Sequence, residues 1–155
     1  MDLQELAQAI ATKADVALRP ASASDLAQLR ALGAPPTLVA FYELFEPAEG
    51  IEFKQVRIWP ASRIVEENRD YVPGADLHHH GYVVFATTEY GDTYCFDPSE
   101  PGPSVIIMTH EVSFDELAAD EIKKYRKVVA ADFTDFLQRF LDEQLDIEPL
   151  YDPAS

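Results

Sequence analysis

A cluster of histidines and acids in the middle of the chain has the side-chain types that could bind a metal. His78, His79 and His80 follow one another, and Asp76 and His110 could add further ligands. Neighbouring residues of an extended chain point to opposite sides, so three consecutive histidines do not converge on one ion. We therefore predict a solvated loop at residues 70–80, with no metal and no other cofactor.

Carboxylates suitable for acid–base chemistry bracket an alternating run of residues. Asp92 and Asp97 lie at its two ends, and Glu89 precedes it. Paired carboxylates can catalyse proton transfer when one is desolvated, but the sequence supplies neither a nucleophile elbow nor a phosphate-binding glycine loop. The single cysteine, Cys95, lies next to Phe96 and is predicted to be a small buried residue. We predict that the protein is not an enzyme and that the two aspartates bond turn amides.

Aromatic residues with acids nearby are a stronger functional signal, because such residues anchor protein interfaces. For Trp59 the alternative is packing in the core. The predicted partner-binding residues are Trp59, Tyr71, Glu89, Tyr90, Asp92 and Tyr94.

The charge balance narrows the class of partner. The chain has 28 acidic and 12 basic residues, for a formal net charge of −16. Nucleic acids and anionic membranes need a cationic surface, so the charge argues against both and favours a basic protein partner. One basic cluster, residues 123–127, is expected to pair with the nearby acids Glu116, Asp120 and Glu121.

Targeting signals are not evident in the sequence. No run approaches the roughly 20 apolar residues that span a bilayer, and the first residues are acidic where a secretory signal would be basic. We therefore expect a cytoplasmic protein. At 155 residues we expect a single domain over residues 1–145, followed by a frayed acidic tail over residues 146–155.

Three runs of strand-forming residues in the middle of the chain predict an antiparallel meander that the helices must cover. These runs are 82–86, 92–96 and 105–108. Apolar periodicity and capping residues predict the helices, which we expect over 2–15, 23–32, 36–45, 61–69 and from Phe133, capped by Asp132.

Other segments give weaker signals. Residues 52–58 predict one strand with a bulge between Phe53 and Val56, where the alternation changes phase. Ser113 is expected to cap a short acidic helical segment that runs to Glu121. Val128 and Val129 fit an extended or a helical conformation equally well.

The order of these signals over residues 22–142 resembles the SUKH superfamily, also called the cell-wall-assembly-regulator family. The resemblance rests on Leu32–Pro36 (LGAPP) before an aromatic helix, on Ile58–Pro60 (IWP) before a helix with Ile64 and Asn68, on the meander, and on Ala130–Leu137 (AADFTDFL). The sequence differs at Ala48–Gly50, where the family usually has an Asn-Gly pair, and in its His-rich loop.

The resemblance implies an α+β domain whose mixed, largely antiparallel sheet of about 4–6 strands is wrapped by N-terminal and C-terminal helices. It also implies a binding module. Bacterial members resemble immunity proteins that neutralise contact-dependent or polymorphic toxins, and fungal relatives resemble regulators or scaffolds of cell-wall synthesis. We expect an immunity protein whose acidic surface binds a basic toxin domain. The alternative is an intracellular regulatory or scaffolding module.

Overall fold

The structure, a computed structural model, describes residues 1–98 and 103–145. Its helices are α1 (Leu3–Ala14), α2 (Ala23–Ala31), α3 (Pro36–Leu44), α4 (Ala61–Arg69), α5 (Gly74–His78), α6 (Ala119–Ile122), the 3-10 turn η1 (Lys123–Tyr125) and α7 (Phe133–Leu141). Its strands are β1 (Ile51–Phe53), β2 (Val56–Ile58), β3 (Val83–Thr88), β4 (Thr93–Phe96), β5 (Val105–Met108) and β6 (Lys127–Ala130). No helix among these described residues is long and apolar enough to cross a membrane. The predicted tail over 146–155 lies outside the described residues.

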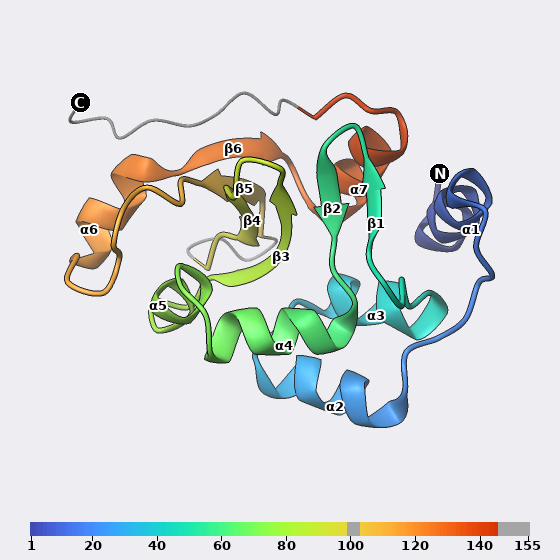
Figure 1. The fold of residues 1–155 in the computed structure, drawn as a ribbon, viewed down its shortest axis with the longest axis horizontal. Helices are drawn as coiled ribbons and strands as arrows, with labels where there is room; N and C mark the ends of the chain where they lie inside the picture. The colour runs from blue at the N-terminus through green and yellow to red at the C-terminus, as the bar shows by residue number, and fades with distance from the viewer. Residues whose placement is uncertain (99–102, 146–155) are drawn as a thin grey trace.

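The six described strands form one sheet in chain order, from β1 at one edge to β6 at the other (Figure 1). All of the described pairs are antiparallel, which agrees with the predicted α+β fold. The predicted meander corresponds to β3, β4 and β5, and the sheet adds β1 and β2 before it and β6 after it. Each strand can return beside the previous one because antiparallel neighbours need only a short connection or a simple excursion between them.

The β1–β2 hairpin replaces the single bulged strand that the sequence predicted over 52–58. Lys54 and Gln55 have positive φ angles of 48° and 68°, as a two-residue hairpin turn of the primed type requires. The chain then reverses, so that Phe53 pairs with Val56. The change of phase in the alternation therefore marks a turn, and the predicted bulge is wrong.

An aromatic layer joins one face of the sheet to α7. The ring of Phe85 lies 5.4 Å from that of Phe133 and 5.0 Å from that of Phe136, measured between centroids. Tyr94 contacts Phe136 at 5.1 Å, and Phe41 of α3 contacts Phe133 at 5.7 Å. The helices α1 and α3 pack on α7, so both ends of the chain cover this face (Figure 1).

Helices α4 and α5 contact β3 on the opposite side, with α2 packed on α4 (Figure 1). Residues 70–80 were predicted to form a loop, and that prediction is wrong for α5. Its first residue, Gly74, approaches α4 so closely that a Cβ atom there would lie 2.2 Å from the carbonyl oxygen of Glu67. The periodic pattern is too short to detect in a helix of 5 residues.

The segment after β5 leads to α6 and the edge strand β6 without the predicted helix from Ser113. Ser113 caps no helix, and α6 begins only at Ala119. Phe114 anchors the segment instead, because its side chain is fully buried and its ring packs edge-on against Tyr125 at 5.9 Å. The pair Val128 and Val129, which fitted two conformations, lies in strand β6.

Candidate functional site

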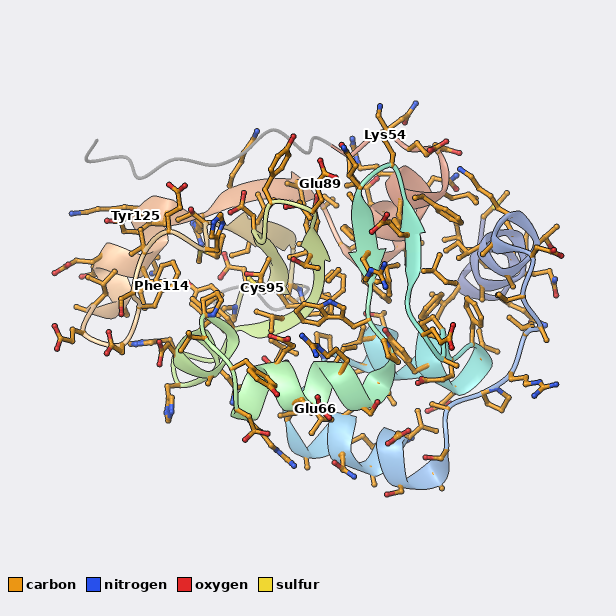
Figure 2. The ribbon with its side chains drawn as sticks, in the orientation of Figure 1. Lys54, Glu66, Glu89, Cys95, Phe114 and Tyr125 are labelled. Carbon is orange, nitrogen blue, oxygen red and sulfur yellow. The ribbon has the colours of Figure 1, made fainter. Side chains whose placement is uncertain are left out.

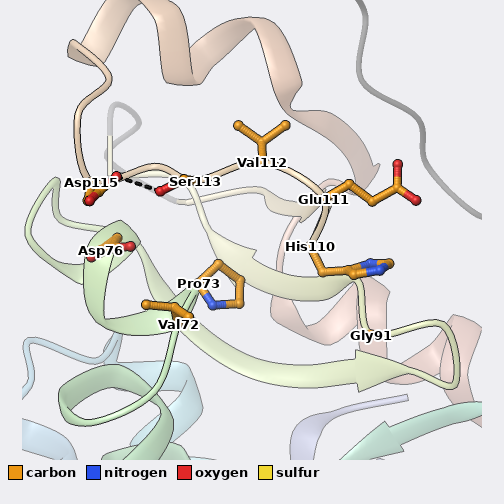
Figure 3. Close-up of a pocket in the computed structure, with 9 residues that line it drawn as sticks. All are labelled: Val72, Pro73, Asp76, Gly91, His110, Glu111, Val112, Ser113 and Asp115. Carbon is orange, nitrogen blue, oxygen red and sulfur yellow. Dashed lines mark hydrogen bonds between the residues drawn. The ribbon is translucent and has the colours of Figure 1, made fainter. Parts of the chain in front are cut away.

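A hollow of about 530 Å³ opens where three segments of the chain meet (Figure 3). These segments are the connection from α4 into α5, the turn between β3 and β4, and the loop that follows β5. The hollow is lined by Val72, Pro73, Asp76, Gly91, His110, Glu111, Val112, Ser113 and Asp115, and we call it the acidic hollow.

The lining carries carboxylates and no lysine or arginine. Asp76 is half-buried on α5, and Glu111 and Asp115 are exposed on the loop after β5. The Ser113 hydroxyl donates a hydrogen bond to Asp115 Oδ1 at 2.5 Å, which holds that side chain in place (Figure 3). Because like charges gather without a cation among the lining residues, the hollow favours a positively charged group.

Asp92 fixes the loop that forms one wall of the hollow. Its side chain is buried. Its Oδ1 accepts a hydrogen bond from the backbone N of His110 at 3.1 Å, and the same oxygen lies 2.8 Å from the ring Nδ1 of His110. The prediction that Asp92 bonds a backbone amide is confirmed, but the amide belongs to the loop after β5. A buried carboxylate needs such partners, because an unpaired charge away from water is costly.

Gly91 allows the β3–β4 turn to approach that loop. Its φ is +92°, a conformation that residues with a Cβ rarely adopt, and a Cβ there would lie 3.4 Å from Cγ of His110. The β3–β4 turn thus contributes directly to the hollow through Gly91.

Two of the predicted aromatic residues lie next to the acidic hollow in the chain. Tyr71 precedes Val72 and is 50% exposed, and Tyr90 precedes Gly91 and is 42% exposed. Val72 itself is 73% exposed. Large apolar side chains that remain exposed beside a hollow are typical of binding surfaces.

Glu89 is exposed as expected, but it bonds to a neighbouring turn. Its Oε1 accepts a hydrogen bond from Nε2 of Gln55 at 2.5 Å, and its backbone N donates to the carbonyl of Gln55 at 3.0 Å. Figure 2 shows Glu89 near Lys54 at the tip of the β1–β2 hairpin. Glu89 therefore ties the hairpin to the β3–β4 turn.

Three predicted partner-binding residues are not exposed. Trp59, Asp92 and Tyr94 have exposed fractions of 6%, 1% and 0%. The expectation of an accessible surface is wrong for Asp92 and Tyr94, and for Trp59 the alternative of core packing holds. Tyr94 belongs to the aromatic layer under α7, and Asp92 holds the loop after β5. The carbonyl of Trp59 accepts a hydrogen bond from the buried Tyr42 hydroxyl, which keeps the end of β2 inside the core.

Trp59 lines a second hollow, of about 380 Å³, together with Glu49, Arg57 and Arg63. The lining of this second hollow includes two arginines, whereas the acidic hollow has none. A basic partner would therefore favour the acidic hollow.

One residue of the His-rich segment and one of the basic cluster have structural partners. His78 lies in α5 with Nε2 2.8 Å from the carbonyl oxygen of Leu32. Arg126 forms an ion pair with the buried Asp97, not with the acids at 116–121 that we expected. In the part of the chain that the structure describes, no group of three or more His, Cys, Asp or Glu could hold a metal ion.

The thiol of Cys95 is inside the sheet, as predicted. Burial and the nearby Asp97 raise its pKa far above the ordinary value, so the reactive thiolate is strongly disfavoured. This thiol is therefore unsuited to nucleophilic chemistry.

Sequence reasoning missed several residues of the hollow. Val72, Glu111 and Asp115 lie in segments with no periodicity, where the sequence gives no indication of which side chains meet. Asp76 and His110 were noticed as potential metal ligands, and the structure brings both to the hollow in a different role. The pairing of β4 with β5 is the feature that could have placed His110 near Asp92.

The fold and the site define an α+β protein with an antiparallel six-stranded meander and an acidic hollow beside one of its turns. The model of the SMI1 / KNR4 family (SUKH-1) matches residues 20–139, and the chain belongs to this family. Domains of the SUKH family are known in immunity proteins and in related regulators. Comparisons with curated proteins and with solved structures gave no significant match.

Proposed function

We propose that the protein is a non-enzymatic binding module that captures a basic protein domain at the acidic hollow. The observation that carries this proposal is the lining itself, in which Asp76, Glu111 and Asp115 meet no lysine or arginine. Exposed Tyr71, Val72 and Tyr90 nearby in the chain supply apolar and aromatic contact area, which charge alone does not provide.

The net charge of −16 supports this choice of partner. A molecule with a large negative net charge attracts a basic domain over distances of about 10 Å at moderate salt and speeds its association. The same field repels nucleic acid and anionic membranes.

The most specific version of the proposal is immunity, in which the basic partner is a toxin domain. A toxin that acts on nucleic acid needs a basic active surface, and an acidic protein that binds this surface excludes the substrate. Membership of a family known in immunity proteins supports this version.

Catalysis by the hollow has little support. The His110–Asp92 pair resembles an acid–base pair, but the nearby Ser113 hydroxyl is bonded to Asp115, and the Cys95 thiol is buried. A reaction would need a nucleophile or an ion within reach of that pair.

Coexpression in bacteria tests the proposal. Neighbouring genes are first screened for a C-terminal domain that is toxic in bacteria, and that domain is then expressed with the full chain or with the Asp76→Lys variant. We expect growth with the wild-type chain and loss of growth with the variant. Toxicity that the wild-type chain does not relieve, despite soluble expression of both proteins, would refute the immunity role and leave a regulatory partner to be sought.

A further inference from the structure

The acidic hollow is large enough to take in a long side chain. Its volume of about 530 Å³ falls within the range of roughly 300–1,000 Å³ that ligand sites usually have. The partner would therefore insert a protruding group here, and the surrounding surfaces would meet outside the hollow.

The charge of the lining selects a cation. The carboxylate of the half-buried Asp76 has no hydrogen-bond or ion-pair partner among the described residues. Of the lining residues, only His110 has a side-chain nitrogen, and its Nδ1 already faces Asp92. An apolar or anionic group would remove water from these carboxylates without replacing its hydrogen bonds, which is costly. A neutral donor would replace the hydrogen bonds but would not balance the negative charge.

The spread of the carboxylates favours a broad organic cation. Figure 3 shows Asp76 of α5 near Asp115 of the loop after β5, whereas Glu111 points toward the other end of the hollow. A guanidinium group offers five N–H donors in a plane and can reach carboxylates on separate segments, whereas an ammonium group is compact.

Apolar residues in the lining suit the stem of such a side chain. Val72, Pro73 and Val112 all border the hollow. The three methylene groups of an arginine can pack on apolar surface while the charged end reaches the carboxylates.

We infer that the acidic hollow receives an arginine side chain of the partner protein. The inference rests on the proposed function, because it names the chemistry by which that partner is held at the same site. It adds that the guanidinium lies between Asp76 and Asp115, with its stem against Val72 and Pro73.

Titration of the ¹⁵N-labelled full chain with small probes tests this inference by NMR. The probes are Nα-acetyl-arginine amide, the uncharged citrulline analogue, the lysine analogue and spermidine. We expect arginine to shift the amide resonances of Asp76, Gly91 and Ser113, with affinity about tenfold or more above citrulline, because charge-assisted hydrogen bonds are lost in citrulline.

Matched double variants separate the hollow from the general charge. Asp76→Asn with Asp115→Asn should abolish the localised shifts, whereas Glu66→Gln with Asp120→Asn removes the same charge from exposed positions and should preserve them. Equal shifts with citrulline, or none with arginine, would overturn the inference. Equal or tighter binding of lysine or spermidine would overturn the assignment to arginine.

The two proposals fail in distinguishable ways. If the chain rescues growth from the toxin but arginine leaves the resonances of the hollow unchanged, the inference fails and the binding function stands. If arginine binds in the hollow but no toxin is neutralised, the immunity role fails and the chemistry of the hollow stands.

Discussion

His110 contacts a single carboxylate oxygen of Asp92 twice, through its backbone N at 3.1 Å and its ring Nδ1 at 2.8 Å. Asp92 directly precedes β4, and His110 follows β5 by one residue, Thr109. The two strands are paired at Thr93 and Met108, so the bonds from His110 to the Asp92 side chain extend the β4–β5 pairing beyond the ends of the strands. These bonds determine where the loop after β5 leaves the sheet, and hence the wall of the acidic hollow.

Replacing Asp92 should destabilise the protein more than replacing His110. Asp92→Ala removes the acceptor for a part-buried backbone N–H and should lower the free energy of unfolding by about 1–3 kcal/mol. His110→Ala keeps the backbone bond and should cost about 1 kcal/mol or less. Urea unfolding measures both values, and equal losses would contradict the structural role of Asp92.

Asn68→Ala should expose the dependence of β3 on a side chain of α4. The Asn68 amide donates to the carbonyl of Val84 at 2.8 Å and accepts from its backbone N at 3.0 Å, which covers β3 beyond the end of β2. Loss of both partners should cost about 2–4 kcal/mol in urea unfolding. The control is Glu66→Ala, an exposed change on the same helix, and a similar cost in both variants would refute the prediction.

Gly74→Ala should disrupt the packing of α5 on α4. The added Cβ would lie 2.2 Å from the Glu67 carbonyl oxygen, so the two helices must separate, and we expect a loss of at least about 2 kcal/mol. Gly33→Ala is the control, because an added Cβ there meets nothing within 4 Å. This variant should lose only the strain energy of a φ of +84°, about 1–2 kcal/mol. Thermal unfolding that ranks Gly33→Ala as the more damaging change would contradict this packing.

Stability should depend on pH through Asp135 at the start of α7. The N–H of Ala131 and the Arg139 guanidinium both bond this carboxylate, and they hold its pKa below the usual value. A lowered folded pKa contributes stability above the unfolded pKa of about 3.9, and this contribution is lost as pH falls through the folded pKa.

Asp135→Asn should therefore be less stable than the wild type at pH 7, with a difference that shrinks on acidification. Arg139→Gln should show a smaller effect of the same sign, because the bond from Ala131 remains. Urea unfolding between neutral and acidic pH gives both differences, and a difference that grows as the pH falls would reverse the predicted sign.

Local patterns predicted much of the fold because periodicity and capping depend only on residues that are contiguous in the chain. The apolar spacing after Phe133 and the Asp132 cap define α7, and the cap bond to the Asp135 amide is present at 2.8 Å. The hairpin at Lys54 and α5 were missed. The short helix α5 packs on α4 where Gly74 approaches Glu67, and the tip of the hairpin bonds Glu89 through Gln55, so both depend on tertiary contacts.

The site was less predictable because exposure depends on tertiary packing. Tyr94 and Tyr90 have the same chemistry and lie four positions apart, but α7 covers Tyr94 and leaves Tyr90 exposed. The alternation of β4 could indicate that Tyr94 faces a layer, but not that the layer is a helix. The carboxylates of the hollow come from segments about 35 positions apart, and only the folded chain brings Asp76 to the same hollow as Glu111.

The central claim is that the acidic hollow binds a basic protein domain, and calorimetry with the basic partner recovered on the immobilised full chain tests it most directly. The wild-type chain should bind with an affinity that falls as salt rises, Asp76→Lys should weaken binding about 100-fold or more, and the exposed control Glu66→Lys should change it by less than about tenfold. Wild-type affinity in Asp76→Lys, equal losses in the two variants, or an affinity independent of salt would contradict the claim.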